Sequence, residues 1–166
     1  MSLPPILRHV YNHGTEKPET TIEAPAYVNA LVANDSVVIA ACADGSVRVF
    51  EHDGKPAREI DAHQGSATAL ALRGDDLLTG GTDGVLRLFS LKSGKKKKEW
   101  TLSPVPLRTV AIDPEGESYA AGGDDGVIRV FRADADQPAQ RREMPGHDGP
   151  VTTISFTPSD GRLVSG

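Results

Sequence analysis

The fold can be inferred from one stretch of the sequence, Leu77-Leu78-Thr79-Gly80-Gly81-Thr82-Asp83-Gly84-Val85-Leu86-Arg87-Leu88-Phe89. Two apolar runs in it meet at an Asp-Gly pair, which tolerates the positive φ angles of the tight turns that join twisted strands. The stretch therefore predicts a β-hairpin. The same pattern returns twice, in residues 39–50 and 119–131.

The pattern repeats with a period of about 40 residues. The aromatic residues that close the copies are separated by 39, 39 and 42 positions: Tyr11, Phe50, Phe89 and Phe131. In each full copy an Asp stands six positions before the Phe: Asp44, Asp83 and Asp125. Helical repeats of this length need amphipathic helices, whereas these copies contain short β-branched runs broken by Gly, Asp and Pro. The repeat therefore predicts the four-stranded blades of a β-propeller.

We expect a single all-β domain over residues 1–166, with three complete four-stranded blades and a half blade at each end. The complete blades are predicted over residues 28–60, 67–102 and 107–144, and the half blades over residues 6–24 and 151–166. The last hairpin stops at Gly166, before the Asp of its turn, which favours the amino-terminal part of a seven-bladed propeller of about 290 residues. A closed four-bladed ring is the alternative, because the two half blades together supply one blade.

Polar residues at fixed places in the second copy fit a buried hydrogen-bond network. His63 precedes the first strand, Thr79 lies in the second, Asp83 lies in the following turn, and Phe89 closes the third strand. This set resembles the WD40-repeat family, whose repeat carries a Gly-His dipeptide, a Ser or Thr, an Asp and a Trp at these places. Here Ala62 replaces the Gly, and a Phe replaces the Trp.

The resemblance implies a WD40 β-propeller in which the Asp accepts a hydrogen bond from the His and the His reaches the hydroxyl, locking the turn. Gly146-His147 and Ser165 begin the same set in the last copy. The first and third full copies depart from the family pattern, since Ala40 and Ala121 stand where the hydroxyl belongs. A Phe also cannot donate the hydrogen bond that the family's Trp provides, so we expect a shortened network.

The same His, Thr and Asp also resemble, in residue type, the Ser, His and Asp of a catalytic triad. However, the sequence around them contains no nucleophile elbow and no loop to hold an oxyanion. Cys42 is the only cysteine, which excludes a thiolate metal cage and favours a small buried side chain. His9 and His13 are expected on a strand and a turn, where they share no helical face that could hold a metal. We therefore expect no enzyme activity, no cofactor and no metal.

The net charge and the apolar runs of the sequence exclude some classes of binding partner. A formal net charge of −5 at pH 7 argues against general binding to nucleic acid or to an anionic membrane. The longest apolar run, residues 37–43, is too short to span a bilayer, and the first ten residues lack the apolar core of a secretion signal. The sequence therefore predicts an intracellular protein whose partners are other proteins.

The predicted Asp-Gly turns and the loops that contain His63 and His147 gather on one face of the propeller. This face contains candidate interaction residues, with no Lys or Arg in the same turns: Asp44, Asp61, Asp124 and Asp148. We expect the face to favour basic peptide segments. The one basic run, Lys95-Lys96-Lys97-Lys98, is expected on the opposite face. It is interpreted as a solvated turn, or as a nuclear-localisation or acidic-partner patch.

The second half of the sequence has a narrower resemblance. Its motifs are Trp100-Thr101-Leu102 and residues 107–116, 120–125, 146–151 and 154–158. They are similar to the amino-terminal propeller of the chromosome transmission fidelity / acidic nucleoplasmic DNA-binding family. That resemblance implies a scaffold in the nucleus, on chromatin, that acts as a replisome hub in DNA replication and sister-chromatid cohesion. A cytosolic WD40 adaptor for a ubiquitin-ligase or trafficking complex is the alternative, located in the cytoplasm.

Overall fold

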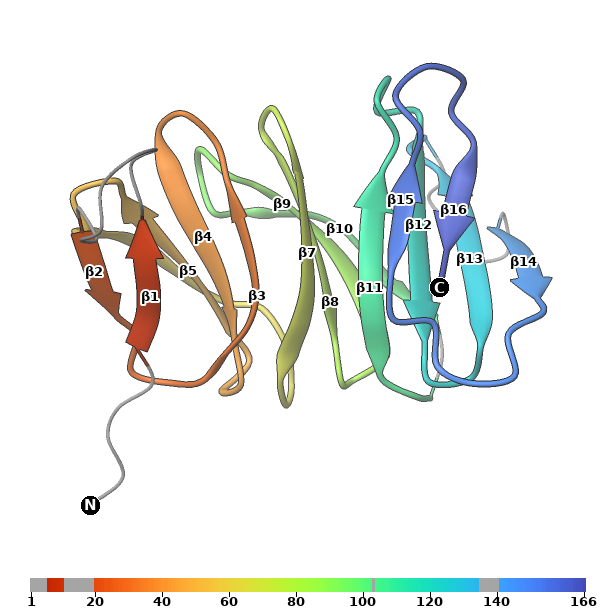
Figure 1. Cartoon of the computed structure of the whole chain (residues 1–166), viewed down its shortest axis with the longest axis horizontal. Helices are drawn as coiled ribbons and strands as arrows, with labels where there is room; N and C mark the ends of the chain where they lie inside the picture. Colours follow the sequence, from red (N-terminus) through yellow and green to blue (C-terminus); the bar gives the residue numbers. More distant parts are fainter. Residues whose placement is uncertain (1–5, 11–19, 103, 135–140) are drawn as a thin grey trace.

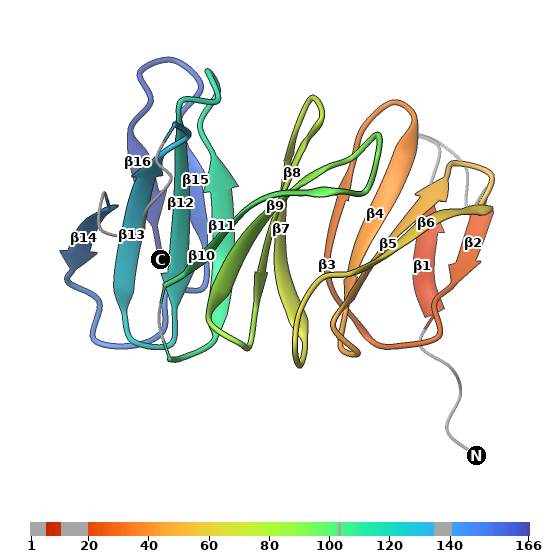
Figure 2. The same cartoon turned by 180° about the vertical axis from the view of Figure 1, so that it is seen from behind.

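The computed structural model describes residues 6–10, 20–102, 104–134 and 141–166. Within these residues the chain forms sixteen β-strands and no helix, and its sheets stand side by side along one arc (Figures 1 and 2). The all-β fold predicted from the repeat is confirmed. Alternating apolar residues in short β-branched runs are the cause, because this pattern buries side chains on the faces of a sheet.

Each complete blade is a four-stranded antiparallel sheet whose strands follow one another in the order of the sequence. Blade 1 contains β3 (Val28–Ala33), β4 (Val37–Cys42), β5 (Ser46–Glu51) and β6 (Pro56–Asp61). Blade 2 contains β7 (Ala67–Arg73), β8 (Asp76–Gly81), β9 (Val85–Ser90) and β10 (Lys96–Thr101). Blade 3 contains β11 (Leu107–Ile112), β12 (Ser118–Gly123), β13 (Val127–Arg132) and β14 (Arg141–Pro145).

A two-stranded hairpin lies at each end of the arc. The amino-terminal hairpin consists of β1 (Ile6–Val10) and β2 (Thr20–Glu23), and the carboxy-terminal hairpin consists of β15 (Ile154–Phe156) and β16 (Leu163–Ser165). The two hairpins lie at opposite ends in both views (Figures 1 and 2). Among the described residues, β1 pairs only with β2 and β16 only with β15. The alternative of a closed four-bladed ring is therefore wrong for this structure.

At the carboxy-terminal end, the regular strands cover less of the chain than the half blade predicted from the sequence. The half blade expected over residues 151–166 has regular strands only from Ile154 onward. Thr152 and Thr153 both donate their backbone N–H groups to the carbonyl oxygen of Gly166, at 2.8 and 3.0 Å, so this segment still lies beside the second strand.

The Asp-Gly turns between the second and third strands have the backbone that their sequence predicts. Gly45, Gly84 and Gly126 have φ angles of 87°, 69° and 70°. The first of these turns is also fastened to the link that enters the next blade, because the Gly45 carbonyl oxygen accepts hydrogen bonds from the N–H groups of Ala62 and His63, at 3.2 and 2.9 Å. A Cβ at Gly45 would lie 2.2 Å from the carbonyl oxygen of His63, so the close approach also requires glycine.

The core consists of apolar side chains held between neighbouring sheets. One buried cluster lies between blades 1 and 2, one between blades 2 and 3, and one between blade 3 and the carboxy-terminal hairpin. Trp100, on the outermost strand of blade 2, is 1% exposed, and its ring centre lies 5.9 Å from that of Tyr119 and 6.1 Å from that of Phe131. Trp100 is thus part of the packing between blades 2 and 3.

Candidate functional site

His63, Thr79 and Asp83 come together in blade 2, where the sequence analysis expected a network. The Nδ1 atom of His63 lies 3.0 Å from Asp83 Oδ1, and its Nε2 atom lies 2.9 Å from Thr79 Oγ1. His63 enters from the link between β6 and β7, Thr79 lies on β8, and Asp83 lies in the turn that follows β8. The side chain of His63 is 0% exposed, so both ring nitrogens depend on these protein partners.

Arg87, which the sequence analysis did not include, completes this network in place of Phe89. Its Nη1 atom lies 2.7 Å from Asp83 Oδ2 and 2.8 Å from the Nδ1 atom of His63. Its Nε atom donates to Glu99 Oε2 at 2.7 Å. Phe89 lies instead in the apolar cluster between blades 1 and 2, beside Leu77. Phe89 therefore does not take part in the polar network: it lies on the same face of β9 as Arg87 but two residues further along, paired with Leu77, and its ring has no polar atom to donate or accept a hydrogen bond.

An arginine four positions after the turn Asp is present in all three complete blades. The Nη2 atom of Arg48 lies 2.8 Å from Asp44 Oδ2, and that of Arg129 lies 2.6 Å from Asp125 Oδ2. The hydrogen bond from Arg48 lowers the pKa of the Asp44 carboxyl to about 2. The signal was available in the sequence, since each Asp that precedes a Phe by six positions also precedes an Arg by four.

The protonation states of this network suit a structural role. Burial lowers the pKa of His63, so its imidazole is neutral at pH 7. Burial alone would raise the pKa of Asp83, but the hydrogen bonds from Arg87 and His63 outweigh it and lower that pKa, so the carboxylate is ionised. The side chain of Thr79 is 0% exposed, and a substrate could not reach its hydroxyl. His63 thus forms hydrogen bonds with both Thr79 and Asp83, and these bonds hold the turn that contains Asp83.

The polar network differs between the copies of the repeat. In the carboxy-terminal hairpin, His147 Nε2 lies 2.9 Å from Ser165 Oγ. In blade 2, a Cβ at Gly81 would lie 2.3 Å from the Nδ1 atom of His63. Cys42 takes the equivalent position in blade 1, where no His precedes the first strand, and its buried thiol packs with Ile22 and Ala24. The prediction that Cys42 is a small buried side chain is confirmed.

The candidate interaction residues on the Asp-Gly face are only partly available to a partner. Asp44 is paired with Arg48, and Asp124 accepts from Arg108 Nε and Nη2 at 2.5 and 2.8 Å. Asp61 and Asp148 are exposed. Fewer carboxylates on this face are therefore available to a partner than the number of Asp residues in its turns indicated, because arginines on neighbouring strands pair with some of them.

Three lysines of the basic run, Lys96, Lys97 and Lys98, lie on β10, and Lys95 precedes the strand in an exposed position. Lys96 Nζ lies 2.6 Å from Glu99 Oε2, and Lys97 Nζ lies 3.0 and 2.7 Å from the carboxylates of Asp75 and Asp76. Lys98 Nζ donates to the carbonyl oxygen of Ala133 at 3.0 Å. The run thus holds the outer strand of blade 2 to its neighbours, which limits its use as a patch for an acidic partner.

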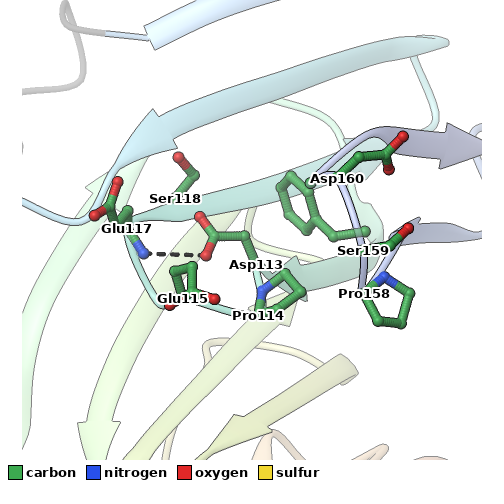
Figure 3. Close-up of a pocket in the computed structure, with 10 residues that line it drawn as sticks. Asp113, Pro114, Glu115, Glu117, Ser118, Pro158, Ser159 and Asp160 are labelled. Carbon is green, nitrogen blue, oxygen red and sulfur yellow. Dashed lines mark hydrogen bonds between the residues drawn. The ribbon is translucent and has the colours of Figure 1, made fainter.

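The structure reveals an acidic hollow of about 310 Å³ that the sequence analysis missed. It lies at the edge of the arc opposite the Asp-Gly turns, between the β11–β12 turn and the β15–β16 turn (Figures 1 and 3). Its lining residues are acidic, small or apolar: Asp113, Pro114, Glu115, Glu117, Ser118, Phe156, Pro158, Ser159, Asp160 and Gly161. The two turns are far apart in the sequence, so no local pattern could have indicated the hollow.

Figure 3 shows how the β11–β12 turn presents these groups. The Asp113 carboxylate accepts hydrogen bonds from the backbone N–H groups of Gly116 and Glu117, at 2.6 and 3.2 Å. On the far side, Arg73 Nε donates to the carbonyl oxygen of Pro114 at 2.8 Å and fixes the turn to blade 2. The geometry of the turn is therefore set by its own residues, while Glu115 and Glu117 are exposed.

Metal-binding groups and long apolar helices are both missing from the residues that the structure describes. Among those residues, no three or more His, Cys, Asp or Glu side chains are grouped so that they could hold a metal ion. No helix in the described part of the chain is long and apolar enough to cross a membrane. The expectation that His9 and His13 hold no metal is not tested, because His13 lies outside the described residues and the side chain of His9 is not described.

Replacing His63 should destabilise the protein more than replacing His52. His63→Ala removes one buried hydrogen-bond partner from each of Thr79 and Asp83, and we expect a loss of about 1–3 kcal/mol in the free energy of unfolding. His52→Ala is the control, since His52 is exposed and its Nε2 atom meets only the carbonyl oxygen of Asn34, at 2.9 Å. Urea unfolding at one protein concentration measures both. Equal midpoints would show that the network does not stabilise the fold.

Replacing Gly81 tests whether His63 needs the space beside it. Gly81→Ala should destabilise by about 1–3 kcal/mol, because the new Cβ would overlap the imidazole. Gly146→Ala is the matched control, since nothing lies within 4 Å of its added Cβ. Combining Gly81→Ala with His63→Ala should cost less than the sum of the two single variants. Additive losses would contradict a clash between these two positions.

The comparisons with known proteins agree with this geometry. The family described as WD domain, G-beta repeat matches residues 16–51, 96–132 and 139–166. A chain of the structure titled "Crystal Structure of Mitotic Checkpoint Complex" superposes with a TM-score of 0.78 and 18% identity, over 85% of this chain and 44% of that one. The computationally designed Ika8 protein superposes with a TM-score of 0.78 and 24% identity, over 92% of this chain and 46% of that one.

At these identities the solved structures show the fold alone, and this chain spans less than half of either of them. No curated protein sequence matches the chain. The family match, however, covers more than half of the residues and includes parts of blades 1, 2 and 3 and the carboxy-terminal hairpin. The chain therefore belongs to the WD40-repeat family, and its sheets are blades of a WD40 β-propeller.

Proposed function

We propose that this protein is a non-catalytic protein-interaction scaffold that binds basic peptide segments in the acidic hollow beside blade 3. WD40 propellers are interaction scaffolds in general, and the hollow is the observation that carries the proposal for this chain. Its volume of about 310 Å³ is at the low end for ligand sites. A hollow of that size suits one or two side chains of a peptide.

The lining of the hollow matches the chemistry of Lys and Arg side chains. These side chains combine an apolar stem with a cationic head. The stem could pack against Pro114, Pro158 and the partly exposed Phe156, while the head meets carboxylates. The formal net charge of −5 also favours the approach of a basic segment and disfavours direct binding to nucleic acid.

Two of the four carboxylates would carry most of the attraction. Asp113 is buried and engaged by the backbone of its own turn, and Asp160 is paired with Arg162 Nε at 2.9 Å. Glu115 and Glu117 are exposed on the rim of the hollow. Their charges are therefore the ones that a basic segment would meet.

A labelled peptide of alternating Arg and Gly is a suitable probe of this proposal. We expect it to bind in fluorescence anisotropy at low salt, and we expect Glu115→Gln with Glu117→Gln to weaken binding by about tenfold or more. The matched control is Asp61→Asn with Asp148→Asn, which removes the same charge from the Asp-Gly face. A loss in the control variant alone would place the binding surface on the Asp-Gly face. Equal binding of a Glu-Gly peptide would sink the proposal altogether.

Within this role we infer a nuclear hub on chromatin that acts in DNA replication and sister-chromatid cohesion. The support is the resemblance of the second half of the sequence to the amino-terminal propeller of the chromosome transmission fidelity / acidic nucleoplasmic DNA-binding family. The motifs of this resemblance include Trp100, which packs blade 2 against blade 3, and residues 154–158, which lead into the acidic hollow. A cytosolic adaptor for a ubiquitin-ligase or trafficking complex is the alternative role.

The location of the protein in cells separates these two roles. A fluorescently tagged chain should enter the nucleus, concentrate at sites of DNA synthesis and purify together with the replicative helicase. The tag expressed alone is the control. A chain that stays in the cytoplasm and purifies with ubiquitin-ligase or coat subunits would favour the adaptor role and contradict the replisome role, without affecting the peptide-binding result.

A further inference from the structure

Of the four carboxylates that line the acidic hollow, only that of Asp113 is buried, and the turn uses only half of it. Asp113 is 9% exposed, and its Oδ1 atom accepts both hydrogen bonds from the turn, from the N–H groups of Gly116 and Glu117. Among the described residues, none donates a hydrogen bond to Asp113 Oδ2. A buried carboxylate oxygen without a donor costs free energy, so Oδ2 is a candidate contact for a ligand.

The Oδ2 atom of Asp113 can be reached from the hollow. In the described part of the chain, the enclosed side-chain nitrogen and oxygen atoms that lack a hydrogen-bond partner are the Nε atoms of Arg48 and Arg129. Asp113 Oδ2 has no donor and is not one of these enclosed atoms, and Asp113 lines the hollow. Figure 3 shows the Asp113 carboxylate between Glu117 on one side and Asp160 on the other. A group that enters the hollow would therefore meet this oxygen.

The corresponding turn of blade 1 shows that this kind of turn does not require a carboxylate. Asn34 follows β3 as Asp113 follows β11, and its Oδ1 atom accepts from the N–H groups of Ser36 and Val37, at 2.9 and 3.0 Å. One amide oxygen therefore satisfies two backbone donors there. The second oxygen and the negative charge of Asp113 are not explained by the turn.

A single available oxygen favours an ammonium group over a guanidinium group. Arg binds a carboxylate best through two parallel N–H bonds, one to each oxygen. The backbone of the turn already occupies Oδ1 of Asp113, so this fork would find one acceptor where it needs two. The ammonium group of Lys is a compact charge whose three donors can each meet a separate acceptor. The Ser118 hydroxyl and the Glu117 carboxylate also line the hollow and can supply further acceptors.

We propose that the acidic hollow selects lysine side chains over arginine side chains, and that Asp113 is the residue that sets this selectivity. The ammonium group of one lysine of a bound segment donates to Asp113 Oδ2, while its apolar stem lies against Pro114 and Pro158. Glu115 and Glu117, exposed on the rim, attract any basic segment and do not distinguish Lys from Arg. This inference rests on the proposed function, since it names the cation that the same hollow selects.

Peptides that differ only in their cation test the selectivity on the wild-type chain. In fluorescence anisotropy, a labelled peptide of alternating Lys and Gly should bind about tenfold more tightly than the Arg-Gly peptide of the same length. A Lys-Gly peptide with trimethylated lysines keeps the charge but has no ammonium N–H to donate. It should therefore lose the advantage over the Arg-Gly peptide.

The outcomes separate this inference from the proposed function. Equal binding of the Lys-Gly and Arg-Gly peptides, or full binding after trimethylation, would overturn the selectivity and leave the basic-peptide scaffold standing. Failure of both peptides to bind would overturn the scaffold proposal as well.

The variant Asp113→Asn removes the selecting oxygen and keeps an acceptor for the turn. Its amide oxygen can accept the two backbone N–H bonds, as Asn34 does in blade 1, and its NH₂ group then faces the hollow. An ammonium group would meet a donor there instead of an acceptor. The variant should therefore bind the Lys-Gly peptide about tenfold more weakly and no longer distinguish it from the Arg-Gly peptide.

The matched control is Asp148→Asn, which removes the same charge from an exposed position on the Asp-Gly face and should keep the preference for Lys. Thermal unfolding checks that Asp113→Asn keeps the melting temperature of the wild-type chain, as expected if the turn retains its acceptor. A folded Asp113→Asn variant that still prefers the Lys-Gly peptide would overturn the inference. If that variant unfolds, the trimethylated peptide on the wild-type chain still decides between the two outcomes.

Discussion

Packing of each sheet against the next is the interaction on which the rest of this structure depends. A four-stranded sheet with apolar side chains on both faces is stable only between two neighbours, and each buried Leu or Val contributes about 1.5–3 kcal/mol. Trp100, Tyr119 and Phe131 join blades 2 and 3 in this way. The turns, the polar network and the acidic hollow all depend on sheets that are already stacked. Where the stacking ends, Leu31 and Val164 are left exposed.

The polar network adapts to the packing of each blade. His63 fits beside β8 because Gly81 has no side chain, and Cys42 fills the equivalent position where no His is present. The Asp-Arg pair, in contrast, occurs in all three complete blades. This pair joins the turn to the third strand of the same sheet. It therefore needs no room for a side chain from the link between two blades, whereas the His63 network does. The pair is therefore the more general device for holding the turns of this chain.

The distribution of charge separates the structural carboxylates from those that can meet a partner. Arginines engage Asp44, Asp83 and Asp124 on the face of the Asp-Gly turns. Glu115 and Glu117, on the opposite edge, border a hollow with apolar walls. A carboxylate that is already paired gains little from a second cation, whereas an exposed one beside an apolar surface can contribute to binding. The edge with the hollow is thus the better candidate for recognition.

The sequence by itself determined the all-β fold, the four-stranded repeat, the Asp-Gly turns and the partners of His63. The fold and the turns follow from the alternation of apolar residues and from fixed offsets within one copy, which local backbone geometry converts directly into strands and turns. The partners of His63 follow from the resemblance of this copy to the WD40 repeat. Only the tertiary structure decided that Asp124 pairs with Arg108 and that the two terminal hairpins lie apart, whereas the four-residue spacing of Asp44 from Arg48 and of Asp83 from Arg87 was already present in the sequence. It also brought the turn at Asp113 beside the turn at Asp160. The physical reason is that the Arg108–Asp124 pair and the acidic hollow depend on contacts between residues far apart in the chain, which no local pattern encodes.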